Sequence, residues 1–275
     1  MSEHIQQKMS AVERIAFIEE SSKLMLGAVP RARSASISIS SNAQLPIDKD
    51  ELNAAIMGTG IVGFDPSMTK RSKRIVKNTY MYADLKALLA FPGENQKEQR
   101  YNSFTTSMRA MGWTFFSSPF SRYTSSSKTL TMDNVALDLI HTVVAGAVGG
   151  VAGKALLGKA ADAALKALKT EPEALKLFED NAKKASGGNF AMTTCKQDDD
   201  GDITMAAAAI QYSCAARPTK VLFWEWATSE VEIWNGASVM TMDEEDYLLV
   251  EDLVVKTLSE MRQKALTIEF GPAAA

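Results

Sequence analysis

The sequence predicts an α+β fold in which a mainly antiparallel sheet is surrounded by helices. Apolar residues at helical spacing occur in blocks, whereas four strand-like segments follow one another between residues 189 and 240. Helices in blocks favour α+β over a doubly wound sheet, and strands joined by short turns pair antiparallel. The chain has 275 residues, of which 46% are hydrophobic, so we expect a single domain with a large core.

The first part of this domain, residues 1–113, is expected to be mostly helical. Pro30 ends the first helical pattern, and Pro66 precedes the longest one. Asp48 followed by Glu51 is typical of a capping box at a helix start. The predicted helices are residues 10–28, 48–57, 67–91 and 94–111.

The remainder of the chain is expected to hold a hairpin, more helices, the strand meander and a final helix. Thr, Ser, Phe and Tyr are frequent in the hairpin segment. Turn residues such as Asp200-Gly201 and Pro218 lie between the predicted strands of the meander. The predicted parts are a hairpin at 114–131, helices at 133–184, a meander at 189–240 and a helix at 243–266. Within the meander, the predicted strands are residues 189–197, 203–215, 220–227 and 230–240.

The second strand of the meander is unusual because it has four consecutive alanines, at positions 206–209. Alanine is depleted in strands and packs little, so another element or a ligand must come close to it. Side chains alternate along a strand. Ala206, Ala208, Ile210, Tyr212 and Cys214 therefore share one face, which we expect to be turned toward the core.

Two short motifs favour turns rather than binding sites. The glycines from Gly58 to Gly63 match a dinucleotide-binding pattern, but Pro66 breaks the chain where the phosphate-binding helix should run. We expect a flexible turn between helices and no nucleotide. Asp200-Gly201 is a preferred hairpin turn, and a two-residue turn there places Cys195 opposite Ala206. No spacing of His, Cys or acidic residues predicts a metal site.

A run of residues 139–153 lacks Asp, Glu, Lys and Arg and contains four glycines. It is shorter than the roughly 20 residues of a membrane span, so a buried, closely packed helix is the first interpretation. Entry into a membrane after a rearrangement is the alternative. His141 lies in this run and is either a core histidine or a weak candidate for a catalytic base.

The net charge of −3 and pI near 5.6 give no basic footprint for nucleic acid. Two cysteines are too few for a disulfide framework, and we expect Cys195 and Cys214 to remain unbridged. The acidic turn beside Cys195 should raise the pKa of its thiol and lower its reactivity. The N-terminus lacks the pattern of a secretory signal, so synthesis in the cytoplasm is expected.

The helical first half, the Gly-rich helix after Asp133 and the late meander with a core cysteine resemble the Evf-type bacterial virulence factors, which are linked to persistence in the insect gut. The resemblance is one of length and layout across nearly the whole chain. It implies a fatty acyl group, such as palmitate, bound through a thioester with its chain buried in the protein. By this resemblance the acylated residue is Cys214, with Cys195 as the alternative.

The resemblance also implies a narrow apolar channel and a bacterial protein that is released or associated with a membrane, with a membrane or a gut-cell component as target. Small residues on the alanine strand and in the Gly-rich helix would leave room for the acyl chain. The expected lining residues are Ala206, Ala208, Ile210, Tyr212, Gly146, Gly149 and Gly150. The sequence leaves the oligomeric state open.

Two other functions fit parts of the sequence. A helix-rich pore-forming toxin would insert residues 139–157 into a membrane. A thiol enzyme for acyl transfer would use Cys214 as nucleophile and His141 as base, with the thioester as its intermediate.

Overall fold

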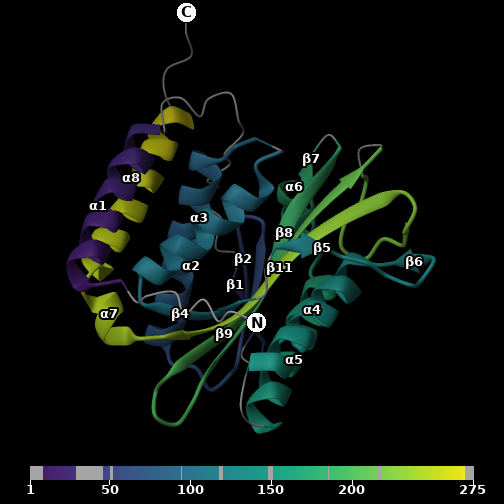
Figure 1. Ribbon diagram of the computed structural model, residues 1–275, viewed down its shortest axis with the longest axis horizontal. Coiled ribbons are helices and arrows are strands. Elements are labelled where there is room, and N and C mark those ends of the chain that lie inside the picture. The colour runs from purple at the N-terminus through teal and green to yellow at the C-terminus, as the bar shows by residue number, and fades with distance from the viewer. Residues whose placement is uncertain are drawn as a thin grey trace, which may run out of the picture. The chain divides into compact units, whose positions relative to one another are not determined.

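The computed structural model in Figure 1 describes residues 9–28, 46–49, 52–93, 95–117, 120–147, 151–184, 186–215 and 218–269. The chain divides into two compact units. One comprises Met1–Ser41, Ile75–Thr114 and Met242–Ala275, and the other Asn42–Arg74 and Phe115–Thr241. We call them the helical unit and the sheet unit.

The main sheet has the strand order β1-β2-β3-β8-β9-β11-β4. The neighbouring pairs with a described register are antiparallel, except that β3 and β8 run parallel. The predicted α+β fold with a mainly antiparallel sheet is therefore confirmed. The strands are β1 Pro46–Lys49, β2 Leu52–Met57, β3 Gly60–Phe64, β4 Trp113–Ser117, β8 Gly187–Gln197, β9 Ile203–Cys214 and β11 Val231–Met242.

Four two-residue strands complete the description. β5 pairs with β11, β7 with β8, and β6 with β10, the last pair forming a separate small sheet. Their bounds are β5 Ser121–Arg122, β6 Thr129–Leu130, β7 Lys183–Lys184 and β10 Trp226–Ala227.

Three helices of the sheet unit pack against the face of the sheet that carries the even-numbered residues of β9. They are α4 Met132–Ala147, α5 Val151–Thr170 and α6 Pro172–Ala182, as predicted for residues 133–184. One apolar cluster joins their inner sides to the sheet. It includes Ala206, Ala208, Ile210 and Tyr212, so the predicted core-facing side of the alanine strand is confirmed.

Gly63 on β3 explains how closely α5 approaches this sheet. A β-carbon at Gly63 would lie 2.9 Å from the carbonyl oxygen of Ala160 and 3.0 Å from the β-carbon of Ala164. Real β-carbons rarely come within 3.0 Å of such atoms. The small residues of strand and helix therefore bring the backbone of α5 almost into contact with β3.

The helical unit contains α1 Ala11–Ala28, α3 Lys97–Ala110, α7 Glu244–Leu248, α8 Glu251–Glu269 and most of α2 Lys70–Ala90. Predicted helices 10–28, 67–91 and 94–111 correspond to α1, α2 and α3. The predicted helix 243–266 is divided into α7 and α8, and Asp243 caps α7 by accepting from the Asp246 N–H at 3.2 Å.

The predicted helix at residues 48–57 is wrong. This segment includes parts of β1 and β2, and a tight turn at Gly58, with φ of 58°, joins β2 to β3. The local capping pattern could not reveal that Ala54 and Ile56 alternate with Ala55 and face the apolar cluster. The glycine motif therefore consists of a hairpin turn at Gly58 and the strand β3, which contains Gly60 and Gly63, and it is not a turn between helices.

The predicted hairpin at 114–131 is also wrong, because its short strands pair with partners far along the chain. Trp234 pairs with Arg122 and Trp226 with Leu130. The predicted third strand of the meander, 220–227, is reduced to two residues in β10, and β9 pairs directly with β11. Long-range pairing of this kind has no local sequence signal.

The hairpin between β8 and β9 is confirmed, but its turn is longer than predicted. Gln197 pairs with Ile203, so residues 198–202 form the turn. Asp198 holds it by accepting from the Gly201 N–H at 3.1 Å and, through its side chain, from the Asp202 N–H at 2.8 Å. Cys195 therefore lies opposite Met205 instead of Ala206.

Candidate functional site

Cys214 is the last residue of β9 and pairs with Val231 of β11. Its N–H donates to the carbonyl oxygen of Ser186 at 3.1 Å, which ties the end of β9 to the segment before β8. The side chain is half-buried and packs against the apolar cluster. Partial burial raises the pKa of the thiol, so it ionises less readily than a free cysteine.

Cys195 differs because it has no exposed surface. It lies on the opposite face of the sheet from Ala206, since its partner is Met205. Burial raises the pKa of this thiol far above its ordinary value, and the acidic turn is not the cause. Cys195 and Cys214 are both free, as predicted.

The even-numbered face of β9 is closely packed. Ala206, Ala208 and Ile210 are 0% exposed and Tyr212 is 1% exposed. The Tyr212 hydroxyl donates to the carbonyl oxygen of Ala182 at 3.3 Å, and burial raises its pKa. In this conformation neighbouring side chains fill the space beside these four residues, so an acyl chain here would have to displace them.

Gly188 makes the contact between Tyr212 and α6 possible. A β-carbon at Gly188 would lie 1.8 Å from the Ala182 carbonyl oxygen and 2.7 Å from the Tyr212 hydroxyl. No sequence motif marks this glycine as part of a site. Its role at the end of the even-numbered face could be found only from the pairing of β8 with β9.

The glycines of the Gly-rich helix fall into two groups. Gly146 is exposed near the end of α4, and a β-carbon there would meet no atom within 4 Å. In this conformation Gly146 therefore does not line the apolar cluster. Gly149 and Gly150 lie outside the described residues. Among the described residues, no helix is both long and apolar enough to cross a membrane.

His141 is exposed on α4 and is not a core histidine. Its ring packs over Gly158 of α5, where an added β-carbon would lie 2.7 Å from Cε1. The ring therefore occupies the contact between two helices, whereas Cys214 packs against the apolar cluster. This position gives His141 a packing role and offers no support for its use as a base.

Glu179 of α6 is a buried carboxylate that sequence reasoning missed. It accepts from the backbone N–H groups of Val221 at 2.7 Å and Leu222 at 3.1 Å. The carbonyl oxygen of Val221 accepts from Trp226 Nε1 at 3.2 Å. These bonds fix the segment that follows Cys214 along the chain. A single glutamate in an amphipathic helix carries no local signal for such a role.

In the helical unit, Asp84 is the carboxyl group with the clearest perturbation. Burial raises its pKa from 3.8 to about 6, although the nearby charge of Arg100 acts in the opposite direction. Arg100 itself caps the end of α2 by donating to the carbonyl oxygens of Phe91 and Gly93. Asp84 therefore titrates close to neutral pH.

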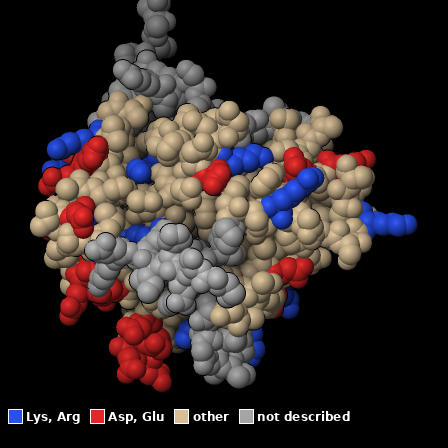
Figure 2. Space-filling view, in the orientation of Figure 1, with Lys and Arg blue, Asp and Glu red and all other residues tan. Residues whose placement is uncertain are grey.

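The face shown in Figure 2 has no large patch of Lys and Arg, and its Asp and Glu side chains are most frequent at the lower left of the view. Within the part of the chain that the structure describes, no group of three or more His, Cys, Asp or Glu residues could hold a metal ion.

No family model matches the chain, and no curated protein is similar to it. Among solved structures, a protein described as a delta-endotoxin is similar over 68% of this chain and 84% of its own, with 7% identity and a TM-score of 0.37. The structure of the Evf virulence factor covers 90% of both chains, with 14% identity and a TM-score of 0.34. The activated Cyt2Ba monomer from Bacillus thuringiensis subsp. israelensis covers 67% of this chain and 97% of its own, with 10% identity and a TM-score of 0.33. At these values the likenesses carry no argument about family, site residues or activity.

Proposed function

We propose that this chain is a bacterial virulence or insect-directed factor that carries a fatty acyl chain on Cys214 through a thioester. The proposal starts from the resemblance in sequence layout. The structural observation that supports it is the contrast between the two cysteines. Cys214 is half-buried at the end of the even-numbered face of β9, whereas Cys195 is fully buried on the other face.

The acyl chain would extend from Cys214 along the even-numbered face of β9. Burying a hexadecanoyl chain contributes on the order of 10 kcal/mol, at ~0.8 kcal/mol per methylene. Against that gain stand an overpacking cost of roughly 1–3 kcal/mol per site and the apolar burial lost by the side chains that the acyl chain displaces. The lipid would then be part of the core of the sheet unit.

Intact-mass spectrometry with and without hydroxylamine tests this proposal. The wild-type protein is expected to carry an added mass that hydroxylamine removes, because hydroxylamine cleaves thioesters. Cys214→Ser should lack this mass, and Cys195→Ala, the matched control, should keep it. If wild type carries no such mass, acylation is wrong. If only the Cys195 variant loses it, the site is wrong.

A leakage assay with phospholipid vesicles separates this function from a pore-forming toxin. A protein whose lipid stays buried is expected to leave a trapped dye inside the vesicles. Release of the dye by both wild type and Cys214→Ser would favour pore formation by a route that needs no acyl chain.

A further inference from the structure

Helix α1 exposes several large apolar side chains and buries mostly polar ones, the reverse of an ordinary surface helix. Val12 is 77% exposed, Leu24 64% and Ile15 37%. Three of its five buried residues are polar, the set being Arg14, Ile18, Ser21, Ser22 and Met25. A surface helix normally buries its apolar stripe and exposes polar residues. Apolar burial therefore holds α1 mainly through Ile18 and Met25, and polar contacts supply the rest of its attachment.

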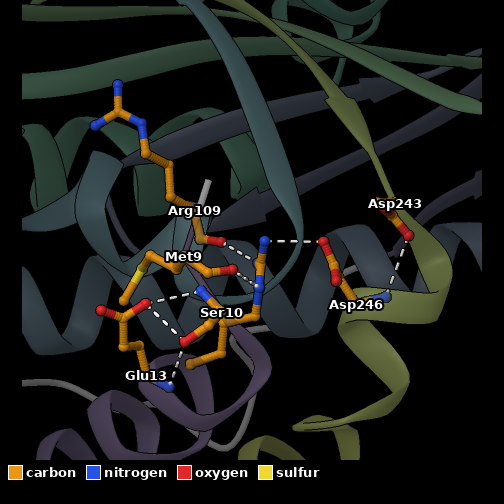
Figure 3. A network of polar contacts seen from close by, with 7 residues as sticks. Met9, Ser10, Glu13, Arg109, Asp243 and Asp246 are labelled. Carbon is orange, nitrogen blue, oxygen red and sulfur yellow. Dashed lines mark hydrogen bonds and ion pairs between the residues drawn. The ribbon is translucent and has the colours of Figure 1, made fainter. Parts of the chain in front are cut away.

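Polar contacts hold the start of α1, as Figure 3 shows. Arg14 donates from Nε to the Met9 carbonyl oxygen at 3.1 Å and from Nη1 to the Arg109 carbonyl oxygen at 2.6 Å. Its Nη2 lies 2.8 Å from Oδ2 of Asp246. The buried guanidinium of Arg14 thus links α1 to the end of α3 and to α7.

A chain of hydroxyl groups holds the middle of α1. Ser22 Oγ lies 2.9 Å from the Tyr82 hydroxyl and accepts from Thr257 Oγ1 at 2.8 Å. The Tyr82 hydroxyl also donates to the Ile18 carbonyl oxygen at 3.0 Å. Apolar contacts add to these, chiefly Ile18, Met25 and the ring of Phe17, over which Lys86 Nζ lies at 4.9 Å.

Both sides of this contact keep hydrogen-bond partners when they separate. The Thr257 hydroxyl has one proton, which can turn from Ser22 to the Leu253 carbonyl oxygen within α8, 2.7 Å away. The side chain of Asp246 is already 18% exposed. On α1, Ser10 and Glu13 form a capping box in which the Ser10 N–H donates to the Glu13 carboxylate at 2.8 Å. The start of α1 is thus satisfied by its own residues.

We propose that α1 is a releasable strap: it opens as a preformed helix while α2, α3 and α8 stay folded. Its polar inner side exchanges protein partners for water, so each hydrogen bond that breaks costs only part of its strength, and the contacts of the charged Arg14 side chain cost the most. Opening uncovers Ile18 and Met25 next to the already exposed Val12 and Ile15. The strap thereby gains a larger apolar surface when it is released.

Hydrogen exchange on the full chain, followed by mass spectrometry, tests this inference. After correction for intrinsic rates, α1 amides are expected to be at least 100-fold less protected than α8 amides around Val254. The double variant Ser22→Cys, Thr257→Cys should form a disulfide when oxidised, because the two oxygens it replaces are 2.8 Å apart. Oxidation should then raise the protection of α1 to that of α8, and reduction should reverse it.

A second pair of variants addresses the guanidinium. Arg14→Met is expected to lower the protection of α1 at least tenfold while α8 changes little. Lys23→Met, which alters an exposed charge on the same helix, should change neither. Equal protection of α1 and α8 in wild type, unchanged by the disulfide, would mean that α1 opens only when the whole unit unfolds, and would overturn the proposal.

Discussion

Replacing Gly63 with alanine should destabilise the sheet unit by pushing α5 away from β3. The added β-carbon would lie 2.9 Å from the Ala160 carbonyl oxygen, whereas ordinary contacts begin at 3.4 Å. The helix must therefore retreat by about 0.5 Å, or β3 must shift by the same amount. The obstructing atom belongs to the backbone, so no side-chain rotation can relieve the clash.

Overpacking of this kind costs roughly 1–3 kcal/mol. Alanine also reduces the entropy of the unfolded chain, which returns about 0.4–1 kcal/mol. From the middle of each range, the net loss for Gly63→Ala is about 1.3 kcal/mol. For a chain of this size that loss lowers Tm by roughly 3–5 °C.

Urea unfolding followed by circular dichroism measures this loss, with an unchanged m-value as evidence that the surface exposed on unfolding is the same. Gly146→Ala is the matched control, because its β-carbon meets no atom within 4 Å. Alanine is the better helix former, so this control should be neutral or more stable by up to about 1 kcal/mol. If Gly63→Ala is as stable as wild type, the proposed close approach of α5 does not limit packing.

Two further predictions concern the carboxylates of Asp84, which is partly buried, and Glu179, which is buried. Burial raises the pKa of Asp84 from 3.8 to about 6, so the ionised carboxylate is disfavoured in the folded chain. The folded state therefore loses stability through Asp84 at pH 7, and regains it as the carboxylate is protonated between pH 7 and pH 4. Asp84→Asn should be more stable than wild type at pH 7, by at most about 3 kcal/mol. Its Tm should also depend less on pH between 7 and 4, and an unchanged pH dependence of Tm would show that Asp84 is not its source. Glu179→Gln replaces a carboxylate that accepts from two N–H groups with an amide that has only one acceptor oxygen. The free energy of unfolding in urea should therefore fall by about 1–3 kcal/mol. Glu173→Gln, an exposed change on the same helix, should be close to neutral. Equal stability of these two variants would contradict a structural role for the buried carboxylate.

The sequence predicted the elements whose evidence is local. Helices α1 to α6 and the long strands β8, β9 and β11 follow from periodicity, prolines and glycines near their ends. The core-facing side of β9 follows from strict alternation, which placed Ala206 and Cys214 on one face.

Features that depend on distant partners could not be predicted. The parallel pairing of β3 with β8 joins residues about 130 positions apart, such as Gly60 and Ala191. The strands before β3 were mistaken for a helix because Asp48 and Glu51 form a local capping pattern. The register of β8 depended on whether the acidic turn had two or five residues. The role of Glu179 and the raised pKa of Asp84 arise only when helices pack, so neither has a sequence signal.

A peptide map of the wild-type protein tests the proposed acylation of Cys214 most directly. Trypsin cleaves after Lys184, Lys196 and Lys220, and Pro218 blocks cleavage after Arg217. The two cysteines therefore fall in different peptides, 185–196 and 197–220. Tandem mass spectrometry is expected to find a hydroxylamine-sensitive acyl mass on the peptide 197–220, at Cys214. Finding that mass on the peptide 185–196, or on neither peptide, would contradict the account.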